Sequence, residues 1–193
     1  MVVKKVLDDV LDEISMPVEK EGELKKKAGE MLRKFSKFKL NAVVGGSLAK
    51  GTLIKKNVQD VDIFVVFSKG KEVGKLESYL KKSKFKAKKL HGSRDYFQVK
   101  EENVVFEIIP VLKLDKKSVE NVTDFSLSHV SYVSKKLKKS KKLAEDIKLA
   151  KSFCFANDCY GAESYIGGFS GYALEVLIIY FGLCLIIPPT MLS

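Results

Sequence analysis

Cysteine is scarce in this sequence of 193 residues, and a secretion signal is missing from its start. Cys154, Cys159 and Cys184 are an odd number and lack CxxC spacing. This pattern excludes a disulfide framework and a zinc ribbon, and it is typical of a reducing compartment. The first residues, MVVKKVLDDVLDE, carry acids where a signal peptide needs an apolar core. We therefore expect a cytoplasmic protein.

The sequence also lacks a hydrophobic run long enough to cross a membrane. The segment 165–187 is mostly apolar, but Glu175 lies within it and glycines lie near its start. Its cleanest part, 176–187, would cover about 18 Å as a helix. The hydrocarbon core of a bilayer is about 30 Å thick. The pattern predicts a buried helix and no membrane partner.

Arginine is nearly absent, although the chain is strongly basic. There are 35 basic and 24 acidic residues, for a net charge of +11, and only Arg33 and Arg94 are arginines. A surplus of this size favours a polyanionic partner, either nucleic acid or an anionic membrane surface. A lysine-rich solvated surface explains it about equally well from composition alone. The lysine runs at 81–89 and 135–142 are candidates for an RNA backbone track or for solvated faces.

Hydrophobic periodicity predicts a mixed α+β half followed by a helical half. We expect one domain over residues 1–118 and a helical domain over 119–193. Pro17 separates the first two helices. The predicted helices cover 2–14, 18–37, 70–83, 125–138, 140–157 and 170–187, and the predicted strands cover 40–44, 60–67, 84–91, 94–100 and 103–112.

Three carboxylates stand out on the predicted strands. Asp60 and Asp62 are two residues apart in DVDIFVVF, so their side chains leave the same face of a strand. Like charges this close repel unless a cation lies between them, and Mg²⁺ takes a few carboxylates together with substrate phosphates. Glu107 interrupts an apolar strand, where its carboxylate needs a cation or a hydrogen-bonding partner. Together they predict a metal site, whereas a solvated strand end or a salt bridge would explain each one singly.

A glycine turn precedes these carboxylates. Gly45 and Gly46 follow a predicted strand, and Ser47 and Lys50 come directly afterwards. Glycines let a backbone approach a ligand closely, and a helix that begins at Ser47 would direct its amides at an anion. Ser47 could donate to a phosphate, and Lys50 could neutralise its charge. The Walker pattern GxxxxGK[ST] is absent.

The order GGS, twelve residues, DVD and a later carboxylate resembles the polymerase-beta-like nucleotidyltransferase superfamily. Val43–Phe67 (VVGGSLAKGTLIKKNVQDVDIFVVF) and Cys159–Gly182 (CYGAESYIGGFSGYALEVLIIYFG) resemble the archaeal-type, class I CCA-adding tRNA nucleotidyltransferases. In that family a mixed sheet flanked by helices is followed by a helical domain with a YGAE…GFSGY signature. The resemblance covers roughly residues 40–182.

The resemblance implies an Mg²⁺-dependent enzyme that adds CMP and AMP from CTP and ATP to the 3′ end of tRNA. It implies that Asp60, Asp62 and Glu107 hold two Mg²⁺ ions. The nucleotide-binding residues that it implies are Gly46, Ser47, Lys50, His129, Lys151 and Tyr160. Lys50 and Glu107 depart from the arginine and aspartate of many relatives. From the residues alone, His129 is a capped or core histidine and Tyr160 a packing residue.

Chains of this family are much longer than this one. We therefore expect a second subunit that supplies the remaining domains, a minimal homo-oligomer, or a shortened copy. The apolar end at 183–192 would suit a partner surface. Two alternatives of other classes stay open: a small nucleotidyltransferase of the toxin–antitoxin type, and a non-catalytic RNA-binding module that has kept the fold.

Overall fold

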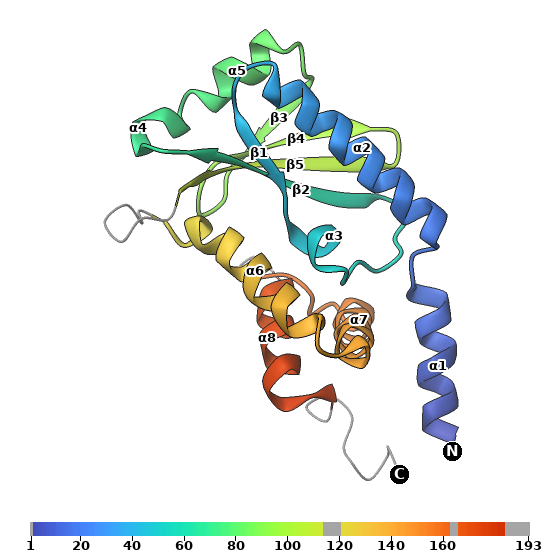
Figure 1. Cartoon of the computed structure of the whole chain (residues 1–193). Helices are drawn as coiled ribbons and strands as arrows, with labels where there is room; N and C mark the ends of the chain where they lie inside the picture. Colours follow the sequence, from blue (N-terminus) through green and yellow to red (C-terminus); the bar gives the residue numbers. More distant parts are fainter. Residues whose placement is uncertain (1, 114–120, 163–165, 184–193) are drawn as a thin grey trace. The chain divides into compact units, whose positions relative to one another are not determined.

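The computed structural model describes residues 2–113, 121–162 and 166–183 (Figure 1). Two compact units are each assembled from separate stretches of the chain. The sheet unit consists of Val18–Ala49 and Asn57–Val130, and the helical unit consists of Met1–Pro17, Lys50–Lys56 and Ser131–Ser193. The predicted domain limit between residues 118 and 119 stays a prediction.

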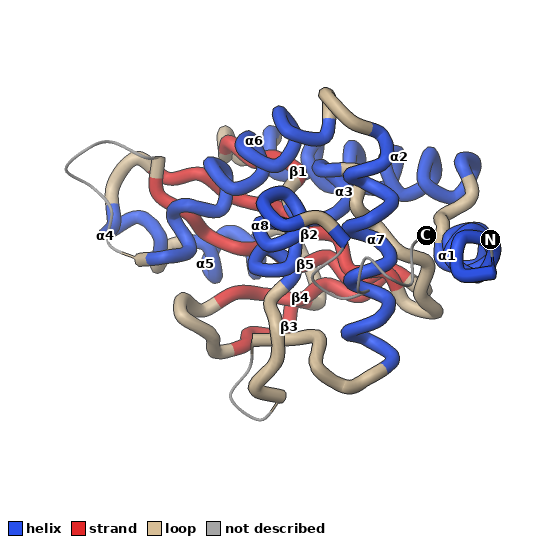
Figure 2. Tube along the Cα trace, turned by 90° about the horizontal axis from the view of Figure 1, so that it is seen from below, coloured by secondary structure: helices blue, strands red, loops and turns tan. Residues whose placement is uncertain are grey.

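The sheet unit is built on five strands in the order β1-β2-β5-β4-β3, which Figure 2 shows side by side. The two central strands β2 and β5 are parallel, and the other neighbours are antiparallel. This mixed sheet with flanking helices confirms the predicted α+β fold. The strands are β1 (Asn41–Val44), β2 (Gln59–Phe67), β3 (Ala87–Leu90), β4 (Tyr96–Glu101) and β5 (Val104–Leu112).

Helix α2 (Val18–Ser36) packs against β1 and β2 and lies across the sheet in Figure 1. It buries Leu24, Ala28, Met31 and Phe35, which follow the spacing of a single helix face. Along β2 the alternate residues Val61, Ile63 and Val65 are fully buried, so the other face of this strand is the one that carries the two aspartates.

The prediction of one continuous helix over 70–83 is wrong. The structure has two short helices instead, α4 (Gly70–Val73) and α5 (Leu76–Lys82). Gly74 is the C-cap residue of α4. A glycine within a helix costs backbone entropy, so a helix readily ends at this position. Helix α3 (Gly46–Lys50) begins one residue before the predicted start.

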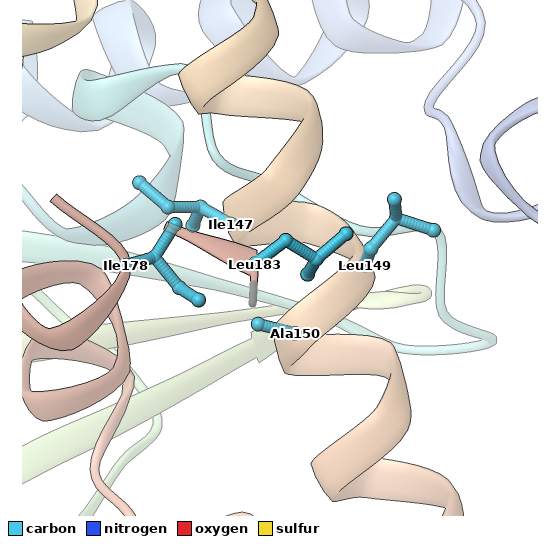
Figure 3. Packing of buried hydrophobic residues seen from close by; sticks show 5 residues of the cluster. All are labelled: Ile147, Leu149, Ala150, Ile178 and Leu183. Atoms are coloured by element: carbon cyan, nitrogen blue, oxygen red, sulfur yellow. The ribbon is translucent and has the colours of Figure 1, made fainter. Parts of the chain in front are cut away.

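The helical unit packs α1 (Val2–Ile14) against α7 (Lys141–Ala156) and α7 against α8 (Gly171–Phe181). The buried cluster between these helices consists of Ile147, Leu149, Ala150, Ile178 and Leu183 (Figure 3). The apolar face of α1 covers this cluster from outside. Before α7 runs α6 (Ser126–Leu137), which follows the short helix η1 (Val122–Phe125).

Helix α8 covers the first part of the predicted helix 170–187, and Cys184 and the apolar end at 184–192 lie outside the described residues. Among the helices that the structure describes, none is long and apolar enough to span a bilayer. Cys154 and Cys159 are free thiols.

Candidate active site

Asp62 and Glu107 are direct neighbours on the two central strands. Strands β2 and β5 run parallel, and their register pairs Asp62 with Glu107 and Asp60 with Val105. Adjacent strands are about 4.8 Å apart, and paired residues point to the same face of a sheet. Two carboxylates 45 residues apart in sequence (107 − 62) are therefore brought together by the central pair of strands.

The glycine turn closes over the Asp62 carboxylate. Gly46 has a φ of +56°, and a Cβ atom at this residue would lie 1.6 Å from Asp62 Oδ2. A Cβ atom at Gly45 would lie 2.1 Å from the ring of Phe64. Gly45 N also donates to the Asp62 carbonyl oxygen at 2.8 Å. Only glycine fits at residues 45 and 46, so the turn after β1 places its backbone directly beside the Asp62 carboxylate.

Glu107 is half-buried on β5, although the apolar residues on both sides of it predict a buried strand. Gln98 on β4 donates to Glu107 Oε1 at 2.9 Å and supplies the hydrogen-bonding partner that the sequence required. Asp62 is also half-buried, whereas Asp60 is exposed near the start of β2. Ser47 lies half-buried at the beginning of α3.

Within residues 2–113, 121–162 and 166–183, no group of three or more His, Cys, Asp or Glu side chains is placed to hold a metal ion. The paired carboxylates of Asp62 and Glu107 still suit Mg²⁺ chemically. Mg²⁺ in phosphoryl-transfer sites is held by one or two carboxylates, and substrate phosphates and water complete its shell. The donor set thus fits an ion that binds together with a triphosphate.

Lys50 and Lys151, both predicted to bind nucleotide, converge on a buried glutamate in the helical unit. Lys50 Nζ lies 2.6 Å from Glu175 Oε2, and Lys151 Nζ lies 2.6 Å from Glu175 Oε1. The hydroxyl of Thr52 donates to Glu175 Oε1 at 2.8 Å and accepts from Lys151 at 2.9 Å. The Glu175 side chain is 0% exposed and the Lys50 side chain only 8%. In this lysine–glutamate cluster, two ammonium groups therefore meet one carboxylate.

Electrostatics keeps Glu175 ionised inside the protein. Burial alone would raise the pKa of this carboxyl, but the ammonium groups of Lys151 and Lys50 outweigh burial and hold the pKa below its ordinary value of 4.5. Sequence reasoning took Glu175 only as evidence against a membrane span. An acid inside an apolar helix is the signal that could have revealed it, because such a residue needs a buried cation.

Tyr160 lies beside Lys151 at the start of α8. A Cβ atom at Gly171 would lie 2.7 Å from the Tyr160 hydroxyl oxygen and 3.9 Å from Lys151 Cε. The YGAE and GFSGY segments pair through Gly161 N, which donates to the Phe169 carbonyl oxygen at 2.9 Å. Because residue 171 is a glycine, Tyr160 and Lys151 can both pack closely against it.

His129 belongs to the sheet unit, on the part of α6 nearest to η1. Its ring stacks on that of Phe125, with centroids 6.4 Å apart and planes 13° apart. Its proposed role at a nucleotide stays a prediction.

A second buried ion pair was missed by sequence reasoning. Asp124 is fully buried and takes a two-point contact from Arg94, whose Nη2 lies 3.1 Å from Asp124 Oδ2. Asp124 Oδ1 also accepts from the backbone N of Leu112 at 2.7 Å, at the end of β5. The pair fastens η1 to the sheet, which is a structural role.

Comparison with known families decides the class of this fold. The family model described as "Nucleotidyltransferase domain" matches residues 24–123, more than half of the 193 residues. The chain belongs to the nucleotidyltransferase family. A second model, "tRNA nucleotidyltransferase, second domain", matches residues 145–186. The first match contains the glycine turn and the three carboxylates, and the second contains Lys151, Tyr160 and Glu175.

Among known proteins, the chain is related to archaeal CCA-adding enzymes, which confirms the resemblance seen in its motifs. It is 47% identical to the CCA-adding enzyme of Nanoarchaeum equitans over 143 residues, which cover 72% of this chain and 35% of that enzyme. It is 34% identical to that of Sulfolobus acidocaldarius over 182 residues, which cover 88% of this chain and 42% of that enzyme. The chain thus spans less than half the length of these relatives.

Solved structures support the fold. A cytoplasmic RNA terminal U-transferase superposes with a TM-score of 0.71 at 18% identity, over 96% of this chain and 55% of that one. The terminal uridylyl transferase Cid1 superposes with a TM-score of 0.73 at 16% identity, over 96% of this chain and 54% of that one. At these identities the likeness is one of architecture.

Proposed function

We propose that this chain transfers nucleoside monophosphates from CTP and ATP to the 3′ end of tRNA. The observation that carries the proposal is the Asp62–Glu107 pair on β2 and β5, closed on one side by the Gly46 backbone. The relatives named CCA-adding enzymes support the choice of reaction and acceptor. Members of this family use a divalent metal ion, and we propose Mg²⁺, with two ions held by Asp60, Asp62 and Glu107.

Each residue has a physical task in this reaction. When bound, Mg²⁺ supplies positive charge that activates the attacking 3′-hydroxyl and stabilises the departing pyrophosphate. Asp62 and Glu107 hold their carboxylates on paired strands, and Asp60 lies two residues before Asp62 on the same face of β2. Gln98 orients Glu107 through its amide. Gly46 and Ser47 offer backbone and hydroxyl donors to a phosphate.

The residues of the helical unit are proposed for phosphate and nucleotide contact on separate grounds. Lys50 and Lys151 hold two ammonium groups at one place, and positive charge favours an anion in its vicinity. Tyr160 places its hydroxyl beside Lys151. His129 is proposed from the family resemblance alone.

We also propose a homo-oligomer or a second subunit as a partner. A cytoplasmic location stays a prediction. Light scattering at micromolar concentration measures the oligomeric state of the chain, and a monodisperse monomer would speak against self-association.

The test is primer extension on tRNA transcripts that end at the discriminator base, after C and after CC, with each nucleoside triphosphate and Mg²⁺. We expect addition of C, C and then A. Asp62→Asn removes one metal-binding charge and should lower the rate by about 100-fold or more. Asp9→Asn is the matched control, because Asp9 is an exposed aspartate on α1.

No addition to any of the three ends would overturn the proposal. Mg²⁺-dependent binding of nucleotide that is lost in Asp62→Asn would then indicate a nucleotidyltransferase for another acceptor, such as one of the toxin–antitoxin type. RNA binding without nucleotide binding would indicate a non-catalytic module.

A further inference from the structure

The two lysine runs of the sequence differ in how the structure neutralises them. Each run contains six lysines, and all twelve side chains are exposed. In the run at 81–89, Lys81 lies 2.8 Å from Glu77, and Lys89 lies 3.6 Å from Glu77 and 2.8 Å from Asp95. Part of this positive charge is therefore balanced within the sheet unit.

The other run is less neutralised, although the charge of Lys142 acts on Asp146, four residues further along α7. It forms the turn between α6 and α7, which we name the α6–α7 lysine turn. Its members are Lys135, Lys136, Lys138, Lys139, Lys141 and Lys142. None of the six forms an ion pair in the part of the chain that the structure describes. Eight consecutive residues thus carry six positive charges and no negative one.

Folding gains little from this arrangement. Lys141 and Lys142 occupy the first turn of α7, which contains no acidic residue. The amino end of a helix favours anions and disfavours cations. Lys135 and Lys136, by contrast, lie in the last turn of α6, where the carboxyl end of the helix favours cations. The two helix ends thus act in opposite directions, and the mutual repulsion of six lysines in eight residues would be relieved by a bound polyanion.

We propose that the α6–α7 lysine turn binds the phosphate backbone of RNA. Six lysines on two helix ends and a tight turn make a compact cationic surface, in which lysine acts as a point charge toward phosphate without reading sequence. Aromatic side chains for base stacking are not part of the run. The surface therefore fits a structured RNA that is held by its backbone, and tRNA as the particular RNA rests on the proposed function.

Binding of a tRNA transcript that lacks its CCA end, measured by fluorescence anisotropy across a series of salt concentrations, tests this inference. Each lysine–phosphate contact contributes about 0.7–0.9 to the slope of log K against log salt. The triple variant K138Q/K139Q/K141Q should lower the slope by about 2 and weaken binding about 10- to 100-fold at 0.1 M salt. Circular dichroism would show that α6 and α7 still form.

The matched control is K82Q/K84Q/K86Q, which removes three exposed lysines without ion pairs from the other run. It should change the affinity and the slope by much less. Equal losses in the two triple variants would show that bulk charge alone binds the RNA, and no loss in K138Q/K139Q/K141Q would remove the turn from the interface. Stronger binding to phosphatidylserine vesicles than to tRNA would also overturn the inference.

These outcomes are separable from those of the proposed function, because binding is measured without nucleotide. Binding through the turn together with no nucleotide addition would refute only the proposed function. Nucleotide addition by K138Q/K139Q/K141Q with unchanged KM for tRNA would refute only the role of the turn.

Discussion

Replacing Glu175 by glutamine keeps the shape of the side chain and removes its charge. In the folded protein, Lys50 and Lys151 would then lose the carboxylate that lies 2.6 Å from the Nζ atom of each. Removing one partner of a buried ion pair costs about 3–5 kcal/mol. For a chain of this length, each kcal/mol lowers the melting temperature by about 2–4 °C. We expect Glu175→Gln to melt about 10 °C lower than the wild type.

Differential scanning calorimetry at pH 7 measures this loss, with Glu102→Gln as the matched control. Glu102 is paired with Lys27 at 2.6 Å, but its side chain is 79% exposed. Water screens such a pair, so its removal should leave the melting temperature nearly unchanged. Equal shifts in the two variants would refute the reasoning, because burial would then make no difference. Should Glu175→Gln fail to fold, Thr52→Val gives a milder test, with an expected loss of about 1–3 kcal/mol for the buried hydrogen bonds.

The same cluster predicts a pH dependence. The pKa of Glu175 is lowered in the folded protein below its ordinary value of 4.5. A carboxyl with a depressed pKa stabilises the fold above its unfolded pKa, and this contribution disappears as the pH falls through the folded value. The difference in stability between wild type and Glu175→Gln should therefore be full above about pH 5 and shrink below pH 4.5.

Three further predictions concern single positions. Gly46→Ala should lower nucleotide addition about 100-fold or more, since its Cβ would displace the Asp62 carboxylate beside it, whereas Gly22→Ala, in open space on α2, should leave activity unchanged. Arg94→Lys should destabilise the fold by about 1–3 kcal/mol in urea unfolding because the two-point contact is lost, and Arg33→Lys at the other, exposed arginine should not. Burial and the hydrogen bond that its own S–H donates to the sulfur of Cys159 raise the pKa of Cys154 to about 11. Iodoacetamide at pH 8 should therefore label it about 200-fold more slowly than an ordinary thiol, as mass spectrometry can check; rapid labelling would contradict its burial.

The local elements could be predicted because their signals are local. The β-branched and aromatic run around Asp60 and Asp62 folds as β2, and the apolar run around Glu107 folds as β5. The Gly45–Gly46 turn was also expected. What the sequence does not contain is the register, because any of several pairings would bury the same alternating residues. That Asp62 faces Glu107, and that Gln98 orients it, becomes evident only in the assembled sheet.

The least predictable feature is the lysine–glutamate cluster, and its sequence distances explain why. Glu175 lies 125 residues from Lys50 and 24 from Lys151, so no local pattern joins them. Each residue taken alone has a bland explanation: a charged interruption of an apolar helix, a lysine after a turn, and a lysine on an amphipathic helix. Burial changes this, because an ionised carboxylate in an apolar helix is stable only beside a cation.

An acid within an apolar run is therefore a reason to search the chain for buried lysines. In this protein the lysine–glutamate cluster also bears on function. Glu175 fixes the Nζ atoms of two lysines in one place. A phosphate that approaches the cluster meets ammonium groups whose side chains are already ordered, so that little conformational entropy is lost on binding. If Lys50 and Lys151 bind triphosphate, Glu175→Gln should raise KM for the nucleotide more than it lowers kcat, and an effect confined to stability would separate the cluster from the reaction.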